Sequence, residues 1–383
     1  MITAVVTIIM FLVMVSLHEF GHFIVGKLLG FKILEYAIGF GPQLLKKQGK
    51  ETMYSLRAIP VGGYCKFEGE DGDSDDDRAF SKQAVWKRIL VVLAGGVSNI
   101  ILGFVLFMII VPMTSPILTN TVESVVKNSY VETAGLQAGD KIVEIDNKKV
   151  SFYNDISLAT EMFTKDTDTT IKVYRNGEKL TLTFKPTEEI INYKYEENGV
   201  TVEETINGVK TTEFYEYGED NVKDDSKVGT EESVTRYIIG FRPHTEPVTV
   251  FNVWQQAWFQ TKFVVKIVYQ SLWQMVTGKV GMDQVSGPVG IVSEVNNAVN
   301  SGSRSWLYVL NLVALLTINL GVFNLLPIPA LDGGRLFFMI IALIRHKPIP
   351  PEKEGMVHAI GMLMLFGLII VISFNDIMKL IGR

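Results

Sequence analysis

His18-Glu19-Phe20-Gly21-His22 is an H-E-x-x-H motif inside an apolar stretch, and no charged residue precedes His18. Two histidines four residues apart lie about 40° apart on one face of a helix, where both imidazoles can bind one metal ion. Glu19 lies beside them and can accept a proton from the attacking water. The run at 2–26 is long enough to cross a hydrocarbon core of about 30 Å. The motif therefore predicts metal-dependent hydrolysis inside a membrane.

Two simpler explanations of this motif are weak. A lone buried histidine is usually a structural residue, but two histidines and a glutamate on one apolar face have no ready structural role. A signal peptide begins with basic residues and has a short apolar core, and this run has neither feature.

Composition favours a membrane protein of more than one unit, because 48% of the 383 residues are hydrophobic and the mean hydropathy is +0.24. The formal net charge of −5 gives no basic surplus that would indicate nucleic acid. The single cysteine, Cys65, excludes an internal disulfide and a cysteine-based zinc site, and we interpret it as a packing residue.

Four apolar segments are long enough to span a bilayer. They cover about 2–26, 89–112, 306–328 and 356–374. Lysine and arginine gather between the first and second segments and between the third and fourth. The positive-inside rule places both of these loops in the cytoplasm, so both termini and the long middle section lie outside.

Catalytic zinc usually has three protein ligands, and the third apolar segment offers a candidate for the last one. Pro327 and Pro329 interrupt the helix there, and Asp332-Gly333-Gly334 follows. Irregular backbone at membrane depth occurs only where protein or a cavity covers it, and the amide of Asn324 can satisfy such backbone or hold an extended substrate. Alone, this segment could equally be a helix end followed by a turn.

Together these motifs resemble those of RseP-type site-2 proteases, the bacterial intramembrane zinc metalloproteases. The matching stretches are 18–22, 39–42, 61–64, 286–290 and 324–333. The resemblance implies that His18, His22 and Asp332 bind one Zn²⁺ per chain and that Glu19 is the catalytic acid and base. It also implies that substrate is positioned by Asn324, Pro327, Pro329, Gly62 and Gly63. One departure is Gly96, where the family commonly has proline, which affects the expected start of the local helix. Asn99, three residues later in the same motif, is retained.

The resemblance implies a zinc metalloendopeptidase of the bacterial plasma (inner) membrane. Its substrates would be single-pass membrane proteins, such as anti-sigma factors or remnant signal peptides, cut within their transmembrane helices in regulated intramembrane proteolysis. No nucleic acid partner is expected. We expect a polytopic α-helical fold with a four-span protease core, a β-rich cytoplasmic loop and one inserted extracytoplasmic PDZ domain.

Five regions follow from these patterns. We expect the first two spans with the H-E-x-x-H motif and the cytoplasmic hairpin loop at 1–112, and a PDZ domain at 113–187. An acidic insert with a return strand follows at 188–250, then an amphipathic interfacial helix region at 251–300 and the last two spans at 301–383. Within them, 36–64 predicts strands and turns, and 70–77 predicts a solvated acidic loop in place of a calcium site.

The PDZ assignment rests on Ala134-Gly135-Leu136, the Gly139-Asp140 turn and the strand-like runs after them. Such a domain can bind a peptide as an added strand, exclude substrates with large extracytoplasmic parts, or serve only as a spacer. Residues 188–236 are rich in charged residues and Thr and predict a β-hairpin or a partly disordered tether.

Two other functions remain open from the sequence. A membrane-anchored zinc protease with a soluble active site would require His18 to lie outside the bilayer. A PDZ scaffold or an inactive relative would bind membrane helices without hydrolysis, and the presence of both Glu19 and Asp332 argues against it.

Overall fold

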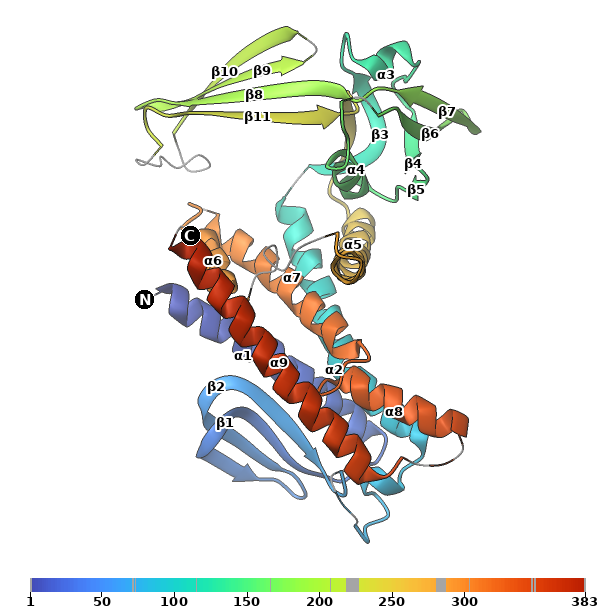
Figure 1. The fold of residues 1–383 in the computed structure, drawn as a ribbon, viewed down its shortest axis with the longest axis vertical. Helices are drawn as coiled ribbons and strands as arrows, with labels where there is room; N and C mark the ends of the chain where they lie inside the picture. The colour runs from blue at the N-terminus through green and yellow to red at the C-terminus, as the bar shows by residue number, and fades with distance from the viewer. Residues whose placement is uncertain are drawn as a thin grey trace. The chain divides into compact units, whose positions relative to one another are not determined.

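The structure is a computed structural model, and it describes residues 2–70, 72, 74–114, 116–165, 167–206, 208–217, 227–279, 287–302, 304–345, 347 and 349–381. Ser286, Asp71 and Asp73 of the motifs above lie outside the described residues. The chain forms two compact units: Met1–Phe107 with Val264–Asn300 and Ser305–Arg383, and Met108–Phe263 with Ser301–Arg304. Figure 1 shows long helices in the first unit and mostly strands in the second.

Among the described residues, four helices are long and apolar enough to cross a membrane. They are α1 (Ile2–Leu28), α2 (Val85–Ile110), α7 (Ser305–Leu325) and α9 (Pro351–Leu380). The third helix is shorter than the expected 306–328, because the backbone leaves the helix before Pro327. No break occurs at Gly96, so the absence of the family's proline leaves α2 continuous.

Helix α1 ends in a local structure that needs glycine. Gly30 has φ of +84°, its N–H donates to the carbonyl of Lys27, and the N–H of Phe31 donates to the carbonyl of Gly26. This pair of hydrogen bonds is the Schellman motif, in which a left-handed residue satisfies the last carbonyls of a helix. It turns the chain directly into the first strand.

Small residues let α1, α2 and α7 approach closely. A Cβ built on Gly21 of α1 would lie 2.4 Å from the carbonyl oxygen of Ala94 in α2. On another side of α2, a Cβ on Gly321 of α7 would lie 2.5 Å from the carbonyl oxygen of Gly96. Close backbone contact of this kind is how helices associate in lipid, where the hydrophobic effect does not drive them together.

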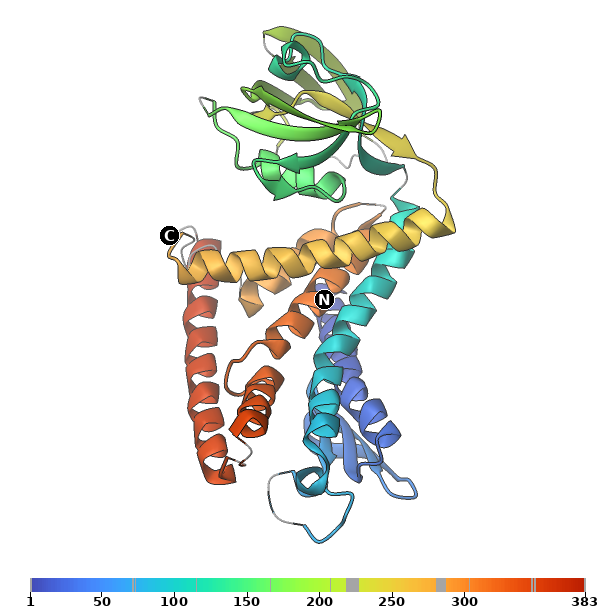
Figure 2. The same cartoon turned by 90° about the vertical axis from the view of Figure 1, so that its right-hand side faces the viewer.

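The chain between α7 and α9 folds back on itself. Helix α8 (Asp332–Arg345), which the sequence analysis did not predict, begins at Asp332. A Cβ on Gly333 would lie 2.0 Å from the carbonyl oxygen of Leu326, so only glycine fits where the loop crosses the first turn of α8. Figure 2 shows α7 and α8, in orange, between α9 in red and α2 in cyan.

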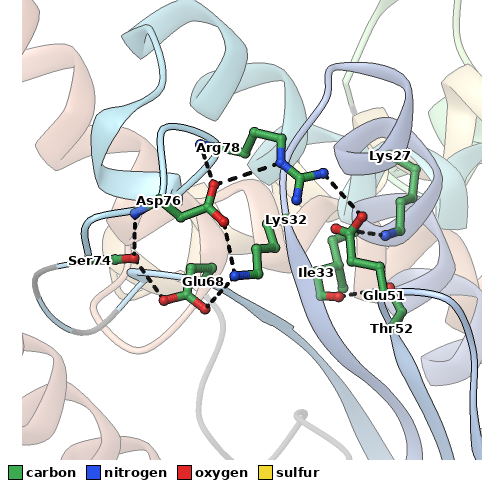
Figure 3. Close-up of polar contacts among 9 residues, drawn as sticks. All are labelled: Lys27, Lys32, Ile33, Glu51, Thr52, Glu68, Ser74, Asp76 and Arg78. Atoms are coloured by element: carbon green, nitrogen blue, oxygen red, sulfur yellow. Dashed lines mark hydrogen bonds and ion pairs between the residues drawn. The ribbon is translucent and has the colours of Figure 1, made fainter.

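Strands β1 (Ile33–Gln48) and β2 (Met53–Phe67) form a sheet of their own beside α1. Both strands are bent, so that 33–38 pairs with 63–67 on one side and 35–38 pairs with 53–56 on the other, while 43–48 also pairs with 53–57. The turn between β1 and β2 makes ion pairs that Figure 3 shows: Glu51 accepts from Lys27 of α1 at 3.3 Å and from Arg78 at 3.1 Å. These contacts hold β2 in a fixed position relative to α1.

The second unit contains a sheet with the strand order β12-β3-β4-β6-β7. Its strands are β3 (Ile117–Val125), β4 (Lys141–Ile145), β6 (Thr169–Arg175), β7 (Glu178–Phe184) and β12 (Phe241–Glu246), with β5 (Lys148–Lys149) beside β4 and helices α3 (Tyr130–Thr133) and α4 (Tyr153–Thr160). Strand β12 comes from the return segment and pairs antiparallel with β3. Its core includes Val122, Ile142 and Ile171.

The charged segment forms a second sheet, not a tether, in its described part. Strands β8 (Thr187–Tyr195), β9 (Gly199–Ile206), β10 (Val209–Glu216) and β11 (Glu231–Ile238) have the order β10-β9-β8-β11. The amphipathic stretch expected at 251–276 is helix α5 (Val250–Val276).

Helix α6 (Pro288–Val299) explains part of the motif at 286–290. The carboxylate of Asp376 in α9 accepts hydrogen bonds from the backbone N–H groups of Gly287, at 2.9 Å, and Gly290, at 2.8 Å. A carboxylate at a helix N-terminus satisfies donors that have no partner within the helix. Asp376 therefore ties the beginning of α6 to α9.

Candidate metal centre

The two histidines of the H-E-x-x-H motif lie side by side on the buried face of α1. Their Nε2 atoms are 3.3 Å apart, and the ring planes are nearly perpendicular, at 86°. Both residues are buried. Helical spacing alone produces this arrangement, because residues i and i+4 occupy the same face.

The third predicted ligand reaches the same point from the other end of the chain. Asp332 Oδ2 lies 3.0 Å from His18 Nε2 and 3.3 Å from His22 Nε2. The ligand atoms of these three residues all lie within 4.8 Å of one another, as a metal site requires. The group was found among the histidine, cysteine and carboxylate side chains of the described part of the chain. The backbone break before α8 is what turns this carboxylate toward α1.

The three atoms fit a zinc ion. His22 Nδ1 lies 2.8 Å from the carbonyl oxygen of Val91 and must donate to it, so its Nε2 carries a lone pair. Asp332 Oδ2 is buried and has no hydrogen-bond partner. Ligands at about 2.1 Å in a tetrahedron stand about 3.4 Å from one another, close to the observed spacings. A metal cation would satisfy three ligand atoms that converge on one small space.

Glu19 lies beside the histidines, next to strand β2. The backbone N–H of Cys65 faces its carboxylate. A Cβ built on Gly63 would lie 3.3 Å from Glu19 Cγ and 2.8 Å from the carbonyl oxygen of Ala37. The absence of a side chain at Gly63 thus lets β2 pass between the neighbouring strand and the carboxylate.

The predicted substrate-positioning residues lie in two places. Gly62, with φ of +89°, and Gly63 are on β2, near Glu19. Asn324 is at the end of α7, with its amide nitrogen 3.4 Å from His18 Nδ1. Pro327 and Pro329 belong to the loop before α8, and Pro329 packs against Gly361 of α9.

Sequence reasoning missed three groups around the site. The carbonyl of Val91 and the amide of Asn99, both in α2, face the two imidazoles. His358 Nδ1 in α9 accepts a hydrogen bond of 2.9 Å from the N–H of Ala330, two residues before Asp332. For Asn99 and His358 a signal existed, because polar side chains inside apolar helices are costly and usually have a specific partner.

Comparison with known proteins agrees with this geometry. A model of Peptidase family M50 matches residues 6–368. A protein of Clostridium acetobutylicum named "Putative zinc metalloprotease" is 36% identical over 374 residues, which is 97% of this chain and 96% of the relative. Proteins of the same name in Clostridium perfringens and Fusobacterium nucleatum are 32% and 30% identical, over 96% and 99% of this chain and the same shares of their own lengths.

Proposed function

The chain belongs to Peptidase family M50 and is a zinc metalloprotease, and on that premise we propose that it hydrolyses peptide bonds inside the transmembrane helices of single-pass membrane proteins. We assign the zinc ligands to His18, His22 and Asp332, with one ion per chain. Glu19 is the catalytic acid and base.

The observation that carries this proposal is the depth of the three ligand atoms. His18 lies 16 residues after the first residue of α1 and 10 before the last, which is about 24 Å and about 15 Å along the helix axis. The helix is apolar on both sides of it. A hydrolase whose metal-binding residues lie this far from both ends of a membrane-spanning helix acts on peptide bonds within the hydrocarbon layer.

The chemistry divides between the ion and the protein. Bound zinc supplies Lewis acidity, which polarises the scissile carbonyl and makes water nucleophilic near neutral pH. Glu19 removes the proton from the attacking water and later delivers it to the leaving amine. The N–H of Cys65, which faces Glu19, would orient the carboxylate for both steps.

Substrate must unwind before it can react, because a helical peptide bond has its carbonyl engaged and its carbon shielded. The segment at 63–67 pairs with 33–38 along one edge, and its Cys65 N–H faces Glu19. An extended substrate segment laid along this strand would gain main-chain hydrogen bonds in place of its helical ones. Asn324 and the loop at 327–329 would hold the opposite side of the segment.

The same proposal assigns the protein to the bacterial plasma membrane, with both termini outside the cytoplasm. Lysine and arginine in 27–88 and 335–353 support this orientation. The unit at 108–263 would then be extracytoplasmic. The sheet of β3, β4, β6, β7 and β12 would belong to the PDZ domain, which filters substrates by the size of their outer part or binds a peptide strand. Anti-sigma factors and remnant signal peptides are the substrate classes that this arrangement suits.

The test combines metal content with cleavage. Detergent-purified protein should contain about one zinc per chain, and Asp332→Ala should lose it. In liposomes, the wild type should cut a single-pass helix within its apolar segment, while Glu19→Gln keeps its zinc and cuts nothing. Cleavage only outside the bilayer would support an anchored protease with a soluble site, and the absence of zinc after supplementation would favour a non-enzymatic scaffold.

A further inference from the structure

Asn99 is a completely buried amide in the middle of α2, an otherwise apolar helix. Its Nδ2 lies 3.5 Å from His18 Nδ1, and its Oδ1 is buried without a hydrogen-bond partner. A buried amide oxygen with no partner is destabilising, because it has lost its hydrogen bonds to water. Its position against an imidazole therefore calls for an explanation.

The metal site explains it through the tautomer of His18. If His18 binds zinc through Nε2, which faces Asp332, its proton sits on Nδ1 and needs an acceptor. A half-turn of the side chain exchanges the positions of the oxygen and nitrogen of an amide. After that half-turn, Asn99 Oδ1 accepts from Nδ1–H, so the ring nitrogen and the amide oxygen each have a partner.

Both imidazoles are held by one stripe of α2. Val91, Gly95 and Asn99 are spaced four residues apart and so lie on one face of that helix. The carbonyl of Val91 accepts from His22 Nδ1 at 2.8 Å, and Asn99 lies opposite His18 Nδ1. Between them, a Cβ on Gly95 would be 2.3 Å from His22 Nε2 and 2.8 Å from His18 Cε1.

A second amide also lies near His18 Nδ1, that of Asn324 at 3.4 Å. Asn324 is only partly buried and sits at the last turn of α7, whereas Asn99 has no exposed surface. The backbone around Asn99 is also fixed, because its carbonyl accepts from Thr317 Oγ1 at 3.4 Å and its Cβ would be 3.2 Å from a Cβ on Gly321. A partly exposed amide is free to contact substrate, and a buried, fixed one is suited to hold a ligand.

We propose that Asn99 is the positioning residue of the zinc site: its amide oxygen accepts the Nδ1–H of His18 and holds Nε2 toward the metal. This inference rests on the proposed zinc site. Partners of this kind typically contribute 10- to 100-fold to metal affinity. The role is separate from contact with substrate, which remains with Asn324.

The first experiment measures zinc affinity by chelator competition in detergent-purified full-length protein. Asn99→Leu, which removes the acceptor at similar volume, should bind zinc 10- to 100-fold more weakly. Asn99→Asp, which keeps an acceptor oxygen, should stay close to wild type. Asn311→Leu, which removes an exposed amide from α7, is the matched control and should not change the affinity. Equal affinity of Asn99→Leu and wild type would overturn the proposal.

Other outcomes are equally decisive. Weak binding by Asn324→Leu together with normal binding by Asn99→Leu would assign the acceptor to Asn324 and reject Asn99. Zinc retained by Asp332→Ala would reject the proposed site itself, whereas zinc lost there but kept by Asn99→Leu rejects only this inference. If Asn99→Leu does not fold, nitrogen-15 spectra of the zinc-loaded wild type decide: a protonated, slowly exchanging His18 Nδ1 is expected, and an unprotonated one contradicts the proposal.

Discussion

Gly95 in α2 touches the imidazole of His22, so that a Cβ at this position would stand 2.3 Å from Nε2, the atom that faces Asp332. Real Cβ atoms do not approach this closely, and the carbonyl of Val91 in the same helix holds the ring through its Nδ1. A methyl group at position 95 would therefore displace His22 Nε2, the proposed ligand atom, from its position facing Asp332.

We expect Gly95→Ala to weaken zinc binding on the order of 10-fold or more and to reduce cleavage in proportion. Zinc content after dialysis against a weak chelator, together with cleavage of a single-pass substrate, measures both effects. Gly367→Ala in α9, where a Cβ would meet open space, is the matched control and should behave as wild type. A Gly95→Ala protein with normal zinc affinity would show that the imidazole can move without cost.

Gly63→Val should separate metal binding from catalysis. The added side chain would press on the carbonyl of Ala37 and on Glu19, neither of which is a proposed ligand. Misplacing a catalytic group by about 1 Å costs on the order of 100-fold in rate, so we expect a loss of that size in kcat with zinc content unchanged.

Single-turnover cleavage and metal analysis of the same Gly63→Val preparation test this expectation. Gly72→Val, where the structure leaves open space around the Cβ, provides the comparison. If Gly63→Val loses its zinc as well, the strand supports the metal site and not only the carboxylate.

His358 supports the loop that carries Asp332. Its Nδ1 accepts from the N–H of Ala330, which has φ of +76°, an unfavourable value for a residue other than glycine. Without that hydrogen bond, worth about 1 kcal/mol, the loop is free to leave this conformation. We expect His358→Ala to weaken zinc binding about 5-fold, because 1.4 kcal/mol corresponds to a factor of 10.

Chelator competition again provides the measurement for His358. The exposed His244 on β12 gives a control of the same residue type, and His244→Ala should leave the affinity unchanged. His358→Gln retains an acceptor oxygen and should lose less than His358→Ala. An equal loss in both variants would mean that the ring contributes by packing and not through its hydrogen bond.

The sequence predicted the meeting of His18, His22 and Asp332 by different routes. The first two follow from helical periodicity, whereas Asp332 was a candidate because prolines end the helix before it, and the resemblance to RseP-type proteases made it the third ligand. Gly95, Asn99 and His358 could not be predicted in the same way. Their roles depend on which faces of α1, α2 and α9 pack together, and no local pattern specifies that packing.

For 188–236 the sequence left a β-hairpin and a partly disordered tether open, and the described part is a four-stranded antiparallel sheet. Strand β10 is exposed along its whole length, and most of β9 is only partly buried. A strand without one buried face has no need for alternating apolar residues, so the usual sequence signal is absent. The two strands are nevertheless ordered, because β10 pairs with β9 along its whole length, from Val209↔Ile206 to Glu216↔Gly199. The composition of the segment did not predict this pairing.

The second unit offers a prediction about acid stability that does not depend on the metal. Asp140 is completely buried, and Arg175 donates to its two carboxylate oxygens at 2.7 Å. Burial raises the pKa of Asp140, but the hydrogen bonds from Arg175 and from the N–H of Gln137 outweigh it, so the pKa is lowered overall. The stability that the ionised Asp140 gives to the folded unit is therefore fully present above about pH 3.9, the pKa of aspartate in the unfolded chain. It is lost as the pH falls through the lowered pKa of Asp140 in the folded unit.

Asp140→Ala should destabilise this unit by about 3 kcal/mol at pH 7, because it leaves a guanidinium without its partner. Limited proteolysis of full-length protein on heating, followed at cleavage sites within 108–263, measures the midpoint of unfolding. Between pH 7 and pH 5 the wild-type midpoint should not change through Asp140, and below about pH 4 it should fall toward that of the variant. Glu178→Gln, on the exposed part of β7, should leave both the midpoint and its acid dependence intact. A wild-type midpoint that fell already between pH 7 and pH 5, with Asp140→Ala showing no such fall, would reverse the sign of the assigned pKa shift.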